Sequence, residues 1–371
     1  MTQVFKYDDE YLGESIKRQA RSAPNDQWLR EFVVNSIEGI RSYKKHFPDD
    51  KDYSPEIVVD QNLRLLELDD LSKISIIDNG IGMNPDDMVN FLHLLGRSGA
   101  DKKDFGTENF GLGAKISSVT RSPLGVIYQS WESGKSGFQV TMHWDNEKGA
   151  PGVKRVGDYY YKEIDDEFKP DIIKNSGHGT IVTLLGEEYK DDTMDPDFWN
   201  IKGIKEVWIA NYLNKRFYQF PENIKVSSRN GYFRDNKWDY VGTTEGLKKT
   251  LEKNKISNGS VELSDAKINW WILNNDRPKS NPREFVSGHT AIVFEDEVFD
   301  ITLGNGNKSR LFDITLGNRN IVLHINPKGK KYHQDQNRRN VYKDSEEPPY
   351  EEWAAEWVLP KEISDYVNTI I

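Results

Sequence analysis

Polar and apolar residues alternate at helical spacing in several stretches of the chain. Between residues 29 and 40 one mostly apolar stripe predicts an amphipathic helix; its members are Leu29, Phe32, Val33, Ser36, Ile37 and Ile40. Asn25 or Asp26 is the expected cap of this helix. Further helices are predicted over residues 8–22, 86–95, 198–217 and, with a break at Pro360, 351–371.

Short apolar or alternating runs predict strands between and after these helices. The predicted strands are 56–60, 64–68, 73–77, 124–130, 137–144, 181–185, 223–228, 266–273, 289–295 and 321–326. Residues 133–137 lack the spacing of a phosphate loop and lead into a strand, so we interpret them as a hairpin turn. Residues 299–305 recur verbatim as 312–318 and are interpreted as adjacent strands.

This mixture of helices and strands predicts an α+β protein. With 371 residues the chain is long enough for two domains, and we place the boundary in the charged stretch near residue 190, giving domains 1–190 and 191–371. No apolar run approaches the roughly 18–20 residues of a membrane-spanning helix, and the start lacks the apolar core of a signal peptide. The chain has no cysteine, which excludes disulfides and thiolate metal sites. We expect a cytoplasmic protein without a membrane partner.

The net charge of −10 argues against a generally basic nucleic-acid binder, so bound DNA is possible but not favoured. A local exception lies between residues 327 and 339, where five cations occur. An exposed, solvated loop and a phosphate contact are the two interpretations of this segment.

Asp78 is the first candidate for chemistry, because it ends an apolar run and is followed by Asn-Gly-Ile-Gly-Met. A buried carboxylate is costly unless a donor is supplied, and the amino group of adenine is such a donor. Gly80 and Gly82 are expected to let the backbone approach a flat ring closely. Taken alone, the motif is also compatible with an ordinary turn at the end of a strand.

Glu31 and Asn35 are one helical turn apart, so their side chains are expected to lie together. A carboxylate and an amide oxygen in this arrangement suit a metal-bound phosphate and its attacking water. A solvated helix face is the alternative interpretation.

Two more segments suit a nucleotide. Residues 106–115 pass from a polar glycine-containing loop into a helix, and backbone N–H groups at such a start bind phosphate. Lys115 either reaches a phosphate oxygen or is a surface lysine. Residues 177–180 lead into a strand whose first threonine, Thr180, is placed to contact adenine through water.

In this order, the four segments resemble the motifs of the GHKL ATPase superfamily, which includes gyrase B, histidine kinases, MutL and the ninety-kilodalton heat-shock chaperone. The resemblance covers about residues 10–190 and implies a Bergerat-type sandwich that binds ATP and Mg²⁺. It implies that Glu31 is the catalytic base and Asn35 the metal ligand. The residues it places at the nucleotide are Asn35, Asp78, Gly80, Gly82, Met83, Ser98, Gly99, Gly111, Leu112, Gly113, Lys115 and Thr180.

The resemblance also implies moving parts. Residues 96–110 resemble the lid over the nucleotide, and residues 191–371 are expected to form a transducer-like α/β domain. In gyrase and MutL such a domain inserts a lysine toward the γ-phosphate; the candidates here are Lys328, Lys330 and Lys331, with Arg338 or Arg339 as a phosphate sensor. An ATP-dependent homodimer that uses residues 1–22 is the implied assembly, and any partner protein is unknown.

Other functions stay open beside a slow ATPase. A histidine kinase is disfavoured, because its dimerisation helices and phosphoacceptor histidine are expected ahead of the nucleotide domain. A non-catalytic, nucleotide-gated adaptor in a larger defence or DNA-maintenance complex, and a MORC- or topoisomerase-like DNA clamp, are the remaining alternatives. Salt-dependent DNA binding would distinguish the clamp.

Overall fold

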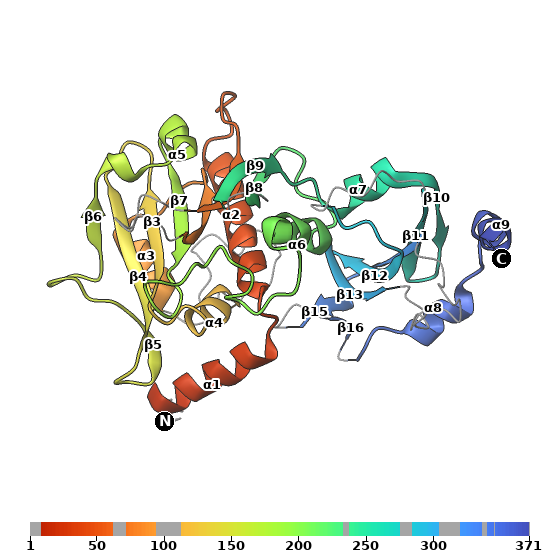
Figure 1. The fold of residues 1–371 in the computed structure, drawn as a ribbon, viewed down its shortest axis with the longest axis horizontal. Coiled ribbons are helices and arrows are strands. Elements are labelled where there is room, and N and C mark those ends of the chain that lie inside the picture. Colours follow the sequence, from red (N-terminus) through yellow and green to blue (C-terminus); the bar gives the residue numbers. More distant parts are fainter. Residues whose placement is uncertain are drawn as a thin grey trace. The chain divides into compact units, whose positions relative to one another are not determined.

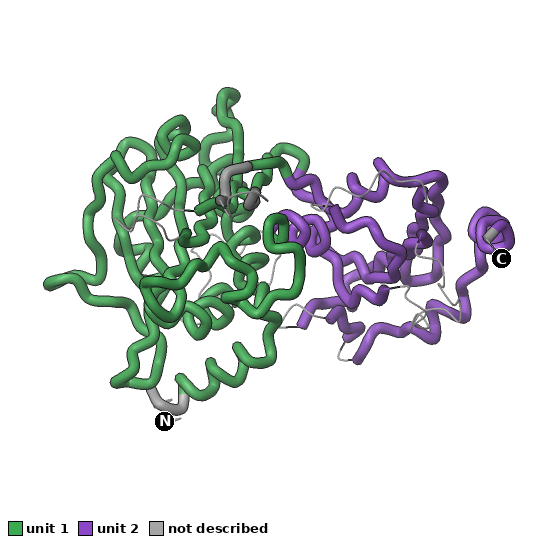
Figure 2. The backbone as a smooth tube through the Cα atoms, in the orientation of Figure 1, with its two compact units in different colours: residues 1–208, 222–243 green, residues 209–221, 244–371 purple. Residues whose placement is uncertain are grey.

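The computed structural model describes residues 9–61, 72–93, 113–232, 237–274, 284–303, 320–335, 340–344 and 346–370. Within these ranges the fold is α+β, as the sequence predicts (Figure 1). The chain divides into two compact units, the first made of residues 1–208 and 222–243 and the second of residues 209–221 and 244–371 (Figure 2). The predicted domain boundary near residue 190 stays a prediction, because each compact unit combines two separate stretches of the chain.

The first unit is built on a nine-stranded mixed sheet in the order β5-β4-β3-β7-β2-β1-β8-β9, with β6 also paired to β4. Its strands are β1 (Glu56–Gln61), β2 (Ile74–Asp78), β3 (Val126–Trp131), β4 (Gly137–Asp145), β5 (Ala150–Val153), β6 (Lys162–Ile164), β7 (Gly179–Leu184), β8 (Lys225–Tyr232) and β9 (Lys237–Thr243). Strands β3 and β4 form the hairpin predicted around residues 133–137. Strand β8 joins the sheet by parallel pairing with β1, which brings residues 225–232 into the first unit.

Helices cover this sheet. They are α1 (Asp9–Ser22), α2 (Gln27–His46), α3 (Pro85–His93), α4 (Gly113–Val119) and α5 (Asp171–Ser176), with short 3-10 turns at Asp166–Phe168 and Lys205–Val207. The apolar stripe predicted for α2 is buried along its whole length, and α2 packs against β2 and α4. Strand β2 separates two layers, because Ile77 packs with Ile173 of α5 while Asp78, the next residue, meets α2 on the other face.

The second unit is a five-stranded sheet in the order β10-β11-β14-β12-β13, together with a small hairpin of β15 and β16. Its strands are β10 (Lys255–Glu262), β11 (Ala266–Leu273), β12 (His289–Phe294), β13 (Glu297–Leu303), β14 (Ile321–Pro327), β15 (Tyr332–Gln334) and β16 (Val341–Lys343). Its helices are α7 (Leu247–Asn254), α8 (Tyr350–Glu356) and α9 (Lys361–Ile370), and α6 (Trp208–Arg216) lies almost wholly within it.

Both faces of this second sheet are buried. Along β11, Trp270 faces a core that includes Trp353 of α8 and Ile363 of α9, whereas Trp271 faces a core with Leu247 of α7. Alternate side chains of a strand point to opposite faces, so one apolar strand supplies two cores. The break predicted at Pro360 separates α8 from α9.

The helix predicted over residues 198–217 is wrong in its first half, where turns and a 3-10 turn precede α6. Tertiary contacts override the helical pattern there. The indoles of Trp199 and Trp208 donate to the carbonyls of Thr193 and Met194 and pack on the ring of Trp28. Ile204, expected to face inward, is 51% exposed.

Several predictions fall outside the described residues: the strand 64–68, the lid 96–110 and the repeat copy 312–318. The first repeat copy lies largely in β13. Across the described part of the chain, no helix combines the length and apolarity needed to cross a membrane.

Asp265 links three parts of the second unit. Its carboxylate accepts hydrogen bonds from Lys331 Nζ at 2.9 Å, Tyr332 OH at 2.7 Å and Trp353 Nε1 at 2.7 Å. Partial burial acts to raise the pKa of Asp265, but these hydrogen bonds outweigh it and hold the pKa below the usual aspartate range. The carboxylate therefore joins the β10–β11 turn to β15 and α8.

We expect Asp265→Ala to lower the free energy of unfolding by about 2–3 kcal/mol at pH 7, because the buried Tyr332 and Trp353 donors lose their acceptor. Since the folded pKa is depressed, this contribution is present above the unfolded pKa of about 4 and is lost as the pH falls below it. Urea denaturation at pH 7 and pH 3.5 measures both effects.

Glu262→Ala is the matched control, because Glu262 pairs with Lys267 and Lys328 beside the same turn but is exposed. Equal stability losses in the two variants would contradict a special role for Asp265.

Candidate functional site

Asp78 lies at the end of β2 in the interior of the first sheet. It is paired with Ile57 of β1 and Thr180 of β7, and only 6% of its surface is exposed. Ser36 Oγ of α2 donates to its Oδ2 at 2.8 Å, and the Gly80 N–H donates to its Oδ1 at 2.9 Å. Burial raises the pKa of Asp78 to about 7, although both hydrogen bonds act to lower it.

The two glycines after Asp78 are required by packing within the chain. A Cβ on Gly80 would lie 2.7 Å from the carbonyl carbon of Gly39 in α2. Gly82 has a positive φ of 75°, and a Cβ there would lie 2.0 Å from the carbonyl oxygen of Trp131. Both glycines therefore permit close packing against α2 and β3, and their approach to a flat ring stays a prediction.

Other contacts fix the rest of the turn. The side chain of Asn79 accepts from the Glu56 N–H and donates to the Ser54 carbonyl, both at 2.8 Å. The Met83 N–H donates to Ser130 Oγ at 2.9 Å, and this hydroxyl also lies 2.9 Å from Thr180 Oγ1. The structure therefore brings Asp78, Met83 and Thr180 into one hydrogen-bonded region, as their assignment to one site requires.

Glu31 and Asn35 lie one helical turn apart on α2. Glu31 is 2% exposed, and its Oε1 accepts from the guanidinium of Arg30 at 2.9 Å. A Cβ on Gly113 would lie 2.4 Å from Glu31 Oε2, so the start of α4 borders this carboxylate directly. Asn35 is partly buried. The structure thus brings Glu31 together with Gly113, although the two are far apart in the sequence.

Lys115 is not a surface lysine. It is 2% exposed, and its ammonium lies over the ring of Phe91 in α3, 4.7 Å from the centroid. Contact between Lys115 and a phosphate stays a prediction.

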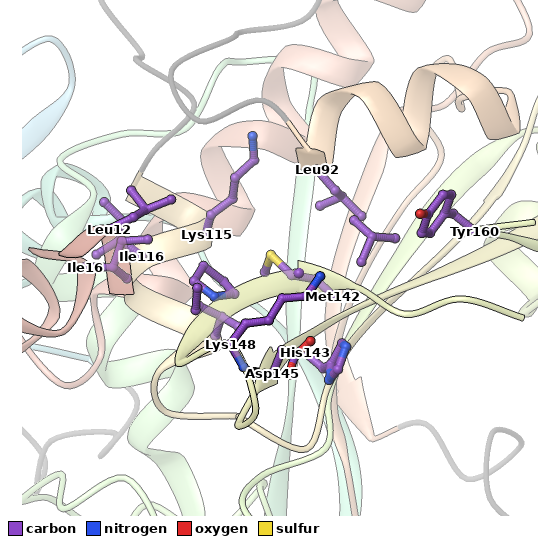
Figure 3. A pocket seen from close by; sticks show the side chains of 15 residues that line it. Leu12, Ile16, Leu92, Lys115, Ile116, Met142, His143, Asp145, Lys148 and Tyr160 are labelled. Atoms are coloured by element: carbon purple, nitrogen blue, oxygen red, sulfur yellow. Dashed lines mark hydrogen bonds between the residues drawn. The ribbon is translucent and has the colours of Figure 1, made fainter. Parts of the chain in front are cut away.

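A cavity of about 240 Å³ lies between α1, α3, α4 and the β4–β5 hairpin (Figure 3). Lys115 contributes to its wall, but its ammonium extends away from His143 and Lys148, which line the opposite side. Glu31, Asn35 and Asp78 do not line this cavity. The cavity is therefore separate from the carboxylates that we expect to act on a nucleotide.

The other predicted site residues stay predictions. Ser98, Gly99, Gly111 and Leu112 lie outside the described residues. In the second unit Lys328 pairs with Glu262 and Lys331 with Asp265, while Lys330 is exposed. The proposed reach of these lysines to a γ-phosphate stays a prediction.

Sequence reasoning missed several side chains that support the site. Arg30 is 3% exposed and pairs with Glu31, and Ser36 was assigned only to the apolar stripe of its helix. His178 contacts the Gly80 carbonyl. A histidine between two glycines, in Gly-His-Gly-Thr, was the available signal for this last contact.

Comparison with known proteins matches residues 49–180 to the family described as histidine kinase-, DNA gyrase B-, and HSP90-like ATPase. The matched segment contains Asp78, Gly113 and Thr180 and begins after Glu31 and Asn35.

Three relatives are each named chaperone protein HtpG. The protein of Treponema denticola is 27% identical over 219 residues, which are 54% of this chain and 32% of the relative. The protein of Bdellovibrio bacteriovorus is 25% identical over 195 residues, covering 52% and 28%. The protein of Cupriavidus necator is 24% identical over 228 residues, covering 59% and 33%. This chain thus spans about a third of the length of these relatives. The family match and the HtpG relatives together support a GHKL-type ATPase domain in this chain.

Proposed function

We propose that this protein binds ATP with Mg²⁺, hydrolyses it slowly, and uses the bound nucleotide to drive lid closure and dimerisation. The observation that carries the proposal is the Asp78 carboxylate, which is buried at the end of β2 with one hydrogen bond to each oxygen. The family match and the HtpG relatives support an ATP-binding, chaperone-like domain.

The environment of Asp78 suits adenine. Each carboxylate oxygen accepts about two hydrogen bonds, so one further donor can be accommodated at each oxygen. The amino group of adenine supplies such a donor and would favour the charged form that burial disfavours. Guanine presents a carbonyl oxygen at the corresponding position, and two acceptors facing each other repel. The site is therefore proposed to select adenine over guanine.

The arrangement on α2 suits hydrolysis. In the described ranges, no three His, Asp or Glu side chains are grouped to hold a metal ion by themselves. Mg²⁺ commonly keeps substrate phosphates and water among its ligands, so the amide oxygen of Asn35 is a sufficient protein ligand. The bound ion would offset charge on the phosphates. Glu31 would orient the attacking water and accept its proton, with Oε2 on the side of Gly113.

A nucleotide-gated adaptor is the second candidate function. The ion pair between Arg30 and Glu31 favours it, because a buried arginine competes with water for the carboxylate. In this case ATP would still bind at Asp78, and only turnover would be absent. The two candidates therefore share the binding site and differ at Glu31.

Asp78→Asn is expected to weaken ATP binding by about 2–3 kcal/mol, roughly 30- to 150-fold, because the amide is a poor partner for the adenine amino group. Isothermal titration calorimetry measures the loss, and Asp86→Asn, an exposed change in α3, is the control.

The folded pKa of Asp78 is raised, so its charged form destabilises the fold as the pH rises toward 7. The variant should therefore be folded and more stable than the wild type at pH 8. Near-normal ATP affinity in this folded variant would refute the adenine assignment.

Glu31→Gln should bind ATP within about threefold of the wild type and lose turnover by at least about 100-fold, because the proton acceptor is removed. A phosphate-release assay at saturating ATP measures the effect. Glu38→Gln, a partly buried change on the same helix, is the control. Wild-type turnover in Glu31→Gln would remove Glu31 from the mechanism, and an inactive wild type that binds ATP would favour the adaptor.

A non-hydrolysable ATP analogue should raise the dimer fraction, whereas ADP should not, because only the γ-phosphate distinguishes the two ligands. Light scattering on the full chain measures the oligomeric state, with Asp78→Asn plus analogue as the control. One unchanged state with analogue, with ADP and without nucleotide would reject ATP-driven dimerisation even if hydrolysis is observed.

A further inference from the structure

His178 holds the backbone of the turn that follows Asp78. It comes directly after Gly177, whose positive φ of 79° ends α5 and redirects the chain. The imidazole is 2% exposed, and its Nδ1 lies 2.6 Å from the carbonyl oxygen of Gly80. A carbonyl oxygen only accepts, so Nδ1 carries the hydrogen. Burial lowers the pKa of His178, which keeps the ring neutral near pH 7.

The ring of His178 is itself held by a group of aromatic side chains. It stacks on Tyr43 of α2, with centroids 3.9 Å apart and planes 18° apart. The ring centroid of Tyr53 lies 4.4 Å from that of Tyr43 and 5.7 Å from that of His178, and the Tyr53 hydroxyl donates to the carbonyl of Asn79 at 2.9 Å. Two successive carbonyls of the turn, those of Asn79 and Gly80, are thus bound by side chains of one aromatic group.

One face of α2 meets this turn at three points. Ser36, Gly39 and Tyr43 are three and four residues apart, so they lie on the same side of the helix. Ser36 donates to Asp78, the Gly39 carbonyl accepts the Ile81 N–H at 3.1 Å, and Tyr43 stacks on His178. On the same helix Asn35 directly precedes Ser36, and Glu31 lies one turn before Asn35.

The hydrogen bonds define what His178 contributes. The peptide unit between Gly80 and Ile81 is held at both ends, its carbonyl by His178 and its N–H by Gly39. The preceding N–H, that of Gly80, fixes Oδ1 of Asp78. Without the imidazole donor, this peptide unit can rotate, and the Gly80 N–H and Asp78 carboxylate lose their fixed orientation.

We propose that His178 is a positioning residue for adenine binding, acting through the Gly80 carbonyl and its stacking on Tyr43 to hold the Asp78 turn against α2. This inference rests on the proposed function, since Asp78 is taken as the group that binds adenine. His178 touches neither the phosphates nor Glu31 in this role, so it should affect nucleotide affinity and leave the rate at saturation nearly unchanged.

Three substitutions separate the two contacts of His178. His178→Phe keeps a ring against Tyr43 but removes the donor; His178→Asn keeps a donor near the position of Nδ1 but removes the ring; His178→Ala removes both. Loss of one hydrogen bond predicts an increase of about five- to tenfold in the Kd for ATP in His178→Phe. His178→Asn should recover the affinity to within about threefold, and His178→Ala should lose at least as much as His178→Phe.

His46→Phe is the matched control. His46 lies on the same helix as Tyr43 and also contacts a carbonyl through Nδ1, that of Ser42 at 2.9 Å, but it is exposed. It should leave Kd and turnover unchanged. In all variants kcat should stay within about twofold of the wild type.

Hydrogen exchange provides a measurement that needs no nucleotide. The Ile81 amide should exchange faster in His178→Phe, return toward the wild-type rate in His178→Asn, and be unaffected in His46→Phe.

A wild type that binds no adenine nucleotide would refute the proposed function, whereas this exchange pattern would still decide whether His178 positions the turn. If His178→Phe does not fold, the comparison of His178→Ala with His178→Asn replaces it, and His178→Ala should bind ATP more weakly because it alone lacks the donor. Unchanged exchange at Ile81, or equal Kd values in His178→Phe and His178→Asn, would overturn the proposal.

Discussion

The burial of one carboxylate, that of Asp78, constrains the architecture of the first unit. Placing a charge at the end of an interior strand is costly unless donors surround it. Ser36 and Gly80 supply two hydrogen bonds, yet burial still raises the pKa of Asp78 to about 7. The Asp78 carboxylate therefore has fewer hydrogen-bond donors than its buried charge requires. A ligand with an amino group would offset part of this desolvation cost. If Asp78 binds adenine as proposed, ligand binding and the stability of the empty protein are opposed.

The hydrogen bonds to the Asp78 carboxylate depend on close packing of the backbone around it. Helix α2 can reach Asp78 only because Gly80 has no side chain where the helix crosses the turn; a Cβ there would lie 2.7 Å from the carbonyl carbon of Gly39. Gly82 allows a similar approach to Trp131 on the other side. Interiors are packed at nearly crystalline density, so a methyl group at these places would displace the helix or the turn. The glycines thus act on the ligand site indirectly, through the distance between α2 and β2.

The same helix connects the two ends of the proposed nucleotide site. Ser36, Gly39 and Tyr43 hold α2 against the proposed adenine end, whereas Glu31 borders Gly113 at the other end. A single rigid helix fixes the distance between the two ends, which favours precise placement of a bound ligand. The second unit has separate cores on the two faces of its sheet. Hydrogen bonds from Lys331 and Trp353 to Asp265 connect its elements.

The sequence by itself determined the features that depend on short spacing. The stripe of α2, the β3–β4 hairpin and the separation of α8 and α9 at Pro360 all follow from residues within one or two turns or strands of each other. Local periodicity and local turn chemistry are sufficient for such features. The assignment of an ATPase motif required several of these segments in order.

Only the tertiary structure decided the contacts between distant segments. His178 and Gly80 are 98 residues apart and Ser36 and Asp78 are 42 apart, so no local pattern shows that they meet. Lys115 is buried by α3 and not solvated, and residues 198–207 leave the helical pattern because Trp199 and Trp208 find acceptors and an aromatic partner elsewhere. Intrinsic propensity decides the conformation of a segment that makes no tertiary contacts. In a packed interior, contacts with distant segments contribute several kcal/mol, and only the complete fold brings those segments near.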